Sequence, residues 1–182
     1  GSRPQRVEFG ALGLGDERTL QAIGRSISNL RDPALLPAMA ALFDRAQDHL
    51  RSHGLSDIAG AWDIDYFQSR VKIALGRHAE AHDLLRHALA VSRRWHGPDN
   101  IHEMTTHIDI GIVYWLQKDT TAALRHHRRA LEIGAKFPVS LINDPNISRN
   151  YLATAYAAGR RLAEAREEYR AQWEGYRDRY GE

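Results

Sequence analysis

The feature that most constrains the fold of this chain is an internal repeat with a period of 42 residues. Three columns of alanine or tyrosine residues share that step: Ala81, Ala123 and Ala165; Ala46, Ala88 and Ala130; and Tyr114 and Tyr156. A fixed period of this length is typical of proteins built from stacked copies of one supersecondary unit. One copy cannot bury its apolar face alone, so the copies are expected to stack around a continuous core.

Within each period the pattern predicts a helix, a tight turn and a second helix. Apolar residues follow helical rather than alternating spacing, and clusters such as Asp32-Pro33 and Gly97-Pro98 separate the helical runs. The predicted helices cover residues 16–30, 33–52, 56–75, 78–95, 100–117, 119–135, 146–158 and 161–179. The sequence therefore predicts an all-α solenoid of about four antiparallel helical hairpins.

The domain organisation follows from the same pattern. Residues 1–15, which contain Gly10, Gly13 and Gly15, are expected to be a flexible lead-in. The pair Gly1-Ser2 is typical of the scar left by tag cleavage and indicates a piece cut from a larger protein. Residues 16–182 are expected to form one domain with units at 20–61, 62–103, 104–145 and 146–182.

Composition excludes several classes of protein. The chain has no cysteine, which rules out disulfide scaffolds, cysteine-ligated metals and thiol nucleophiles. No apolar run approaches the roughly 20 residues that a membrane span needs. Together with a mean hydropathy of −0.52, this predicts a soluble, cytoplasmic protein. A formal net charge of only +2 gives no reason to expect broad nucleic-acid binding.

The repeat resembles the tetratricopeptide repeat, whose pattern is L-G-x2-Y-x8-A-x6-A. Its best match is formed by Ile110, Gly111, Tyr114, Ala123 and Ala130. A second match is formed by Leu152, Ala153, Tyr156 and Ala165; there Gly159 and Ala171 each lie one residue early, so the second helix is expected to pack slightly differently. Residues 62–103 match less fully, with Lys72 in place of the aromatic residue, and residues 20–61 match weakly, like a capping unit.

The unit of 42 residues is longer than the usual tetratricopeptide unit of about 34. Together with Trp95-His96-Gly97-Pro98-Asp99, it resembles the repeats of kinesin light chains and the sensor regions of bacterial regulators. The resemblance implies a right-handed solenoid without cofactors that binds a protein or peptide and belongs to a larger bacterial regulator. The alternative is a sensor or oligomerisation domain, self-associating as a homodimer, that controls an attached DNA-binding or ATPase domain.

In such arrays the first helix of each unit lines a concave groove. The candidate groove residues are those on first helices that face away from the packing columns: Asp63, Tyr66, Phe67, Arg70, Thr105, Ile108, Asp109, Ile112, Trp115, Asn150, Tyr151 and Thr154. The aromatic members could equally fill the core between units, and both interpretations stay open. The carboxylate-binding clamp of chaperone-binding relatives is missing, and Asp63 and Asp109 would repel a carboxylate, so a basic or apolar peptide is expected.

Other kinds of site find less support. The pairs His49/His53 and His78/His82 could share a divalent cation across one helical turn, but no third ligand is fixed, so no metal site is predicted. The basic run 125–129, with Arg86, Arg93 and Arg94, is interpreted as a solvated outer face, with phosphate contact as the alternative. No nucleophile elbow, phosphate-binding loop or dinucleotide motif occurs, so no enzymatic activity or catalytic residue is predicted.

Overall fold

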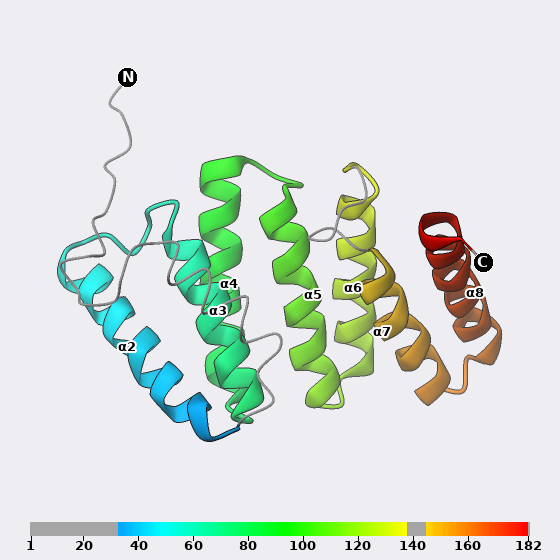
Figure 1. The fold of residues 1–182 in the computed structure, drawn as a ribbon, viewed down its shortest axis with the longest axis horizontal. Helices are drawn as coiled ribbons and strands as arrows, with labels where there is room; N and C mark the ends of the chain where they lie inside the picture. Colours follow the sequence, from blue (N-terminus) through cyan, green and yellow to red (C-terminus); the bar gives the residue numbers. More distant parts are fainter. Residues whose placement is uncertain (1–32, 138–144, 182) are drawn as a thin grey trace. The chain divides into compact units, whose positions relative to one another are not determined.

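The computed structural model describes residues 33–137 and 145–181, and within those ranges it contains helices and no strand. The helices are η2 (Pro33–Leu35), α2 (Leu36–Ser52), α3 (Ala61–Ala74), α4 (His78–His96), α5 (Ile101–Leu116), α6 (Thr120–Gly134), α7 (Pro145–Ala158) and α8 (Leu162–Tyr180) (Figure 1). The expected lead-in, the tag scar and the helix predicted over 16–30 lie outside the described residues.

The helices α2 to α8 confirm the predicted alternation of helix and turn, with one correction. A helix was predicted from residue 56, but α3 begins at Ala61. The preceding residues form two short turns instead, closed by hydrogen bonds from the Ile58 N–H to the Leu55 carbonyl and from the Ala61 N–H to the Ile58 carbonyl. These four-residue turns satisfy the local backbone groups and leave Gly60 at the start of α3.

The chain divides into two compact units, Gly1–Leu84 and Leu85–Glu182, and the division falls within α4. In the first unit α2 packs against α3. The fully or almost fully buried side chains of these two helices include Phe43, Ala46, Leu50, Ile64 and Val71. Their helical spacing gives each helix one apolar face, which is the property that makes the pair stable.

The first unit also buries a lysine, at the position where the tetratricopeptide pattern has an aromatic residue. The Lys72 ammonium lies 3.0 Å from the Asp44 carboxylate and 3.5 Å from Glu80. The Gln68 amide donates to the same Asp44 oxygen at 2.5 Å. A buried cation is tolerated only when it is paired, and Asp44 supplies the pairing.

The second unit contains the larger part of α4 and two helical hairpins that pack side by side. Helix α5 pairs with α6 and α7 pairs with α8, while α6 packs on α7 and α5 also touches α7 (Figure 1). The first hairpin encloses a cluster of Met104, Ile108, Ala130 and Ile133. The second encloses Leu152, Tyr156 and Ala165, against which Leu131 of α6 also packs. The two hairpins therefore share a core through α6 and α7.

None of the described helices is both long enough and apolar enough to cross a membrane.

Candidate functional site

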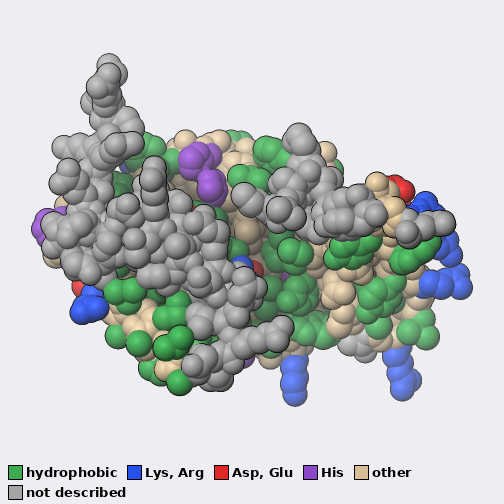
Figure 2. All heavy atoms as spheres, viewed as in Figure 1, with side chains coloured by type: hydrophobic (Ala, Val, Ile, Leu, Met, Phe, Trp, Pro, Cys, Tyr) green, Lys and Arg blue, Asp and Glu red, His purple; other side chains and the backbone are tan. Residues whose placement is uncertain are grey.

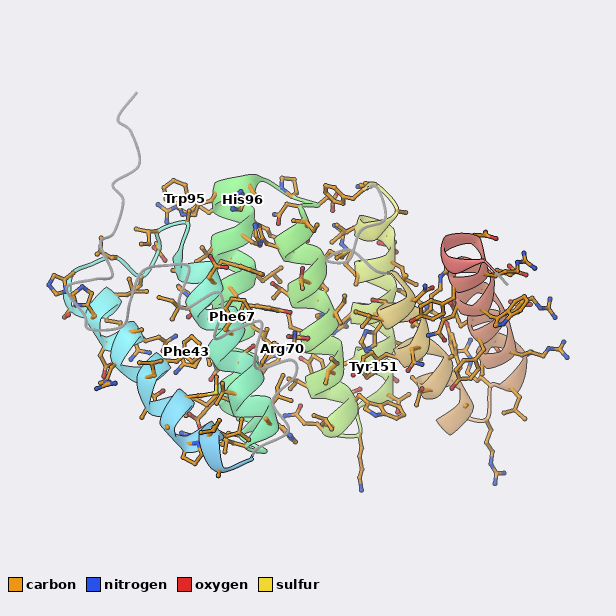
Figure 3. All side chains as sticks on the ribbon, in the orientation of Figure 1. Phe43, Phe67, Arg70, Trp95, His96 and Tyr151 are labelled. Atoms are coloured by element: carbon orange, nitrogen blue, oxygen red, sulfur yellow. The ribbon has the colours of Figure 1, made fainter. Side chains whose placement is uncertain are left out.

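On α3, the candidate groove residues Tyr66 and Phe67 belong to a row of contacting aromatic rings that begins at Trp62. The rings of Trp62 and Tyr66 stack with centroids 4.7 Å apart, and Phe67 meets Tyr66 edge-on at 5.3 Å. The Arg70 guanidinium donates to the Tyr66 hydroxyl at 3.2 Å and lies over its ring. Figure 3 shows Phe67 and Arg70 on this helix. Tyr66 is buried, whereas Asp63, Phe67 and Arg70 stay partly exposed.

On α5, the candidate residues divide into accessible and buried ones. Thr105, Ile112 and Trp115 are partly exposed. Ile108 is 7% exposed and belongs to the core of its own hairpin, and Asp109 is 3% exposed. A partner approaching α5 would therefore meet the first three side chains.

On α7, Asn150 is exposed, and Tyr151 and Thr154 are partly exposed. The Tyr151 ring lies flat against the buried His127 ring of α6, with centroids 4.9 Å apart and planes 4° apart (Figure 3). The Thr154 hydroxyl donates to the Asn150 carbonyl at 2.9 Å. Tyr151 thus holds α7 against α6 and also offers one edge to the outside.

Comparison along the 42-residue period separates accessible columns from buried ones. The columns with some exposure on all three first helices are Asp63, Thr105 and Ile147; Arg70, Ile112 and Thr154; and Ile73, Trp115 and Ala157. A further column, formed by Tyr66, Ile108 and Asn150, is buried at its first two members and exposed at Asn150. Within the second unit, the α5 and α7 members of these columns lie on helices that are in contact with each other.

The structure also contains a buried polar network that the sequence did not indicate. The fully buried carboxylate of Glu103 accepts from Arg93 at 2.6 Å and from the Asp99 backbone N–H at 2.9 Å. Arg129 binds Asp99 and lies 3.6 Å from Glu103. Burial raises the pKa of Glu103, but the Arg93 and Asp99 hydrogen bonds outweigh it and hold that pKa below its usual value.

Two histidines extend this network. The Nδ1 atoms of His107 and His126 are 2.9 Å apart, so one ring donates to the other. His107 Nε2 lies 3.6 Å from Glu103, yet burial dominates and lowers the pKa of His107 to about 4. The Tyr114 ring stacks on His126. Within the residues that the structure describes, no three or more His, Asp or Glu side chains are grouped so that they could hold a metal ion.

The network corrects the interpretation of the basic run 125–129 as a solvated face. His127 is fully buried, and Arg128 donates to the Tyr156 hydroxyl at 3.1 Å through Nε. Arg129 pairs with Asp99 and Glu132. Only some members of the run face solvent, because successive residues of a helix point in different directions. The 42-residue alignment could have indicated that His127 is buried, because it places this residue on the face of α6 that points toward the next unit.

Comparisons with known proteins define the class of this fold. A sequence model of the tetratricopeptide repeat family matches residues 64–136. A crystal structure of BtubC (BKLC) from P. vanneervenii superposes with a TM-score of 0.72 at 19% identity, covering 91% of this chain and 74% of that one. A kinesin light chain with nearly identical TPR-like repeats from Podosopora anserina superposes at 0.67 and 16% identity, covering 91% and 77%.

No curated protein sequence matches the chain significantly. The fold is an all-α, tetratricopeptide-like solenoid, residues 64–136 match the tetratricopeptide repeat model, and the likeness to kinesin light chain repeats is one of fold. Such repeats serve in general as non-catalytic scaffolds for protein interaction.

Proposed function

We propose that this chain binds an extended apolar segment of a partner protein on the face that α5 and α7 form together. The observation that carries the proposal is the set of columns that keep some exposure on every first helix. On α5 these columns contain Ile112 and Trp115, on α7 they contain Thr154, and Asn150 is exposed on α7. A mixture of large apolar side chains and hydrogen-bonding groups is typical of peptide-binding faces.

The polar groups of this face suit the backbone of an extended segment. The hydroxyls of Thr105 and Thr154 donate to the carbonyls of Ile101 and Asn150, at 2.6 Å and 2.9 Å. Their oxygen lone pairs remain able to accept from a backbone N–H, and the exposed Asn150 amide both donates and accepts. Because Asp109 is buried, its charge is not presented to the partner. An apolar segment therefore fits this face better than a strongly charged one.

The proposal is tested by selecting random displayed peptides against the full chain and measuring the affinity of the selected peptides. We expect the double variant Trp115→Ala/Asn150→Ala to weaken them at least about tenfold, the loss typical of central contact residues. The matched control is Trp95→Ala, which removes an exposed tryptophan (46% exposed) at the end of α4 (Figure 3). Selected peptides that bind the double variant unchanged, or a selection that yields no binder, would contradict the proposal.

The cytoplasmic location and the attachment to a bacterial DNA-binding or ATPase regulator stay predictions, since no contact of the described residues bears on them.

A further inference from the structure

Helix α8 carries a row of large apolar side chains that are exposed. Leu162, Tyr169, Trp173 and Tyr176 are 69%, 43%, 59% and 41% exposed. Their spacings of seven, four and three residues place them on one side of the helix. We call these four residues the α8 stripe. Apolar rings exposed together along one line are a mark of an interaction surface, whereas single exposed ones are ordinary.

The stripe borders the side of α8 that packs on α7, and the Tyr169 hydroxyl lies 3.5 Å from the Thr154 hydroxyl of α7. That side carries the buried Ala165, and it carries Glu168, which pairs with Arg149 at 3.2 Å. Gly175 also lies there, close enough to Asn146 that a Cβ would come within 3.1 Å of its side chain. These contacts of α8 with α7 are therefore made by residues outside the stripe.

The 42-residue register shows what the equivalent face does elsewhere in this chain. Tyr169 and Trp173 of α8 correspond to His127 and Leu131 of α6. On α6 this face holds the next helix: His127 is fully buried against the Tyr151 ring of α7, and Leu131 packs on the core of the α7–α8 hairpin. The α8 stripe therefore corresponds to the face of α6 that packs on α7, but it carries larger side chains.

Three arginines run beside the stripe. Arg166, Arg170 and Arg177 follow one another at helical spacing on one flank, and Figure 2 shows basic side chains along the edge formed by α8. Arg177 lies 5.0 Å over the Trp173 ring and 3.6 Å from Asp178. Arg166 and Arg170 have no charged partner among the described residues. Glu167 and Glu174 lie farther around the helix, beyond the arginines.

We propose that the α8 stripe binds an amphipathic helix of a partner protein, in the place that α7 takes on α6. The apolar face of that helix covers Tyr169, Trp173 and Tyr176, and carboxylates on its flank pair with Arg166 and Arg170. A second copy of α8 fits this face less well. In an antiparallel twofold pair each flank meets the same flank of the other copy, so arginines would face arginines. The partner helix is therefore a different one, with an acidic flank.

The test uses a displayed library of amphipathic helices, with the apolar face and both flanks randomised, selected against the full chain. We expect the selected helices to carry Asp or Glu on one flank. Trp173→Ala should weaken them at least about tenfold, and Arg166→Glu/Arg170→Glu should shift the selected flank to Lys or Arg. Trp95→Ala is the matched control and should leave their binding unchanged. Circular dichroism should show unaltered folding, because the substituted side chains are exposed.

Three results would overturn the proposal: no helix selected, selected helices that bind Trp173→Ala unchanged, or selected helices with no charge preference. Light scattering decides the remaining alternative. A dimeric wild-type chain that Trp173→Ala renders monomeric would show that a second copy covers the stripe, against the proposal. The Trp115→Ala/Asn150→Ala variant should bind the selected helices normally, so failure of this surface and failure of the α5–α7 face are distinguishable.

Discussion

The short turns between helices show how single residues set the register of this fold. Gly76, Lys118 and Arg160 lie 42 residues apart and all have positive φ, of 72°, 65° and 57°. In each turn the next residue donates back into the preceding helix, as the Asp119 N–H does to the Tyr114 carbonyl at 2.9 Å. The sequence suggested a shifted turn at Gly159, but the positive φ falls on Arg160. The turn thus keeps the position set by the 42-residue period, although an arginine rather than a glycine must then adopt the left-handed conformation.

This arrangement predicts that Lys118→Gly stabilises the protein. A left-handed conformation costs an L-residue roughly 1 kcal/mol, and glycine avoids that cost, although it loses more entropy on folding. We expect the free energy of unfolding, measured by urea denaturation, to rise by about 0.5 kcal/mol or more. Gly76→Ala is the converse control. It meets no atom within 4 Å, yet it should destabilise the protein because of its φ of +72°. A loss of stability in Lys118→Gly would refute this account.

At the scale of the helices, the close approach of α5 and α6 depends on Gly111. A Cβ at this position would lie 2.6 Å from the His127 ring, which is fully buried against Tyr151. The ring has no room to retreat because α7 closes the other side. The small residue at this position of the repeat pattern therefore serves the packing between helices.

We accordingly expect Gly111→Ala to lower the free energy of unfolding by about 1–3 kcal/mol, the usual cost of overpacking a core. The double variant Gly111→Ala/His127→Ala should lose less than the two single variants together, because removal of the ring removes the clash. Gly60→Ala is the control, since a Cβ there meets nothing within 4 Å. Additive losses in the double variant would show that the ring is not what excludes a side chain at residue 111.

The sequence predicted the helices well but not which of their residues stay accessible. The N-cap of α6 is formed by Asp119, which accepts from the Ala122 N–H at 2.9 Å, and such local signals can be read from the chain. Accessibility depends on neighbouring helices. Tyr66, Ile108 and Asn150 occupy equivalent positions, and only Asn150 is exposed. The same limit explains His127, which lies in a basic run yet is buried, because α7 rather than the local sequence covers it.

At the scale of the whole molecule, two buried histidines make stability depend on pH. His107 and His127 are 6% and 0% exposed, and burial lowers the pKa of each from 6.5 to about 4. Between these values the unfolded chain binds more protons than the folded chain. The free energy of unfolding therefore falls as the pH is lowered through this window, by at most about 3 kcal/mol for each imidazole. Glu103, whose pKa is lowered, adds its own loss only at more acidic pH.

The prediction is checked by urea denaturation at about pH 7 and about pH 5, a window in which the histidines dominate the change. His127→Phe keeps a flat ring against Tyr151 but cannot be protonated, so the difference in unfolding free energy between the two pH values should shrink. The exposed His53 supplies the control, because His53→Gln should leave that difference unchanged. If His127→Phe kept the full wild-type dependence, the buried imidazole would have to be solvated or already protonated in the folded chain, and the tight α5–α6–α7 packing around it would be wrong.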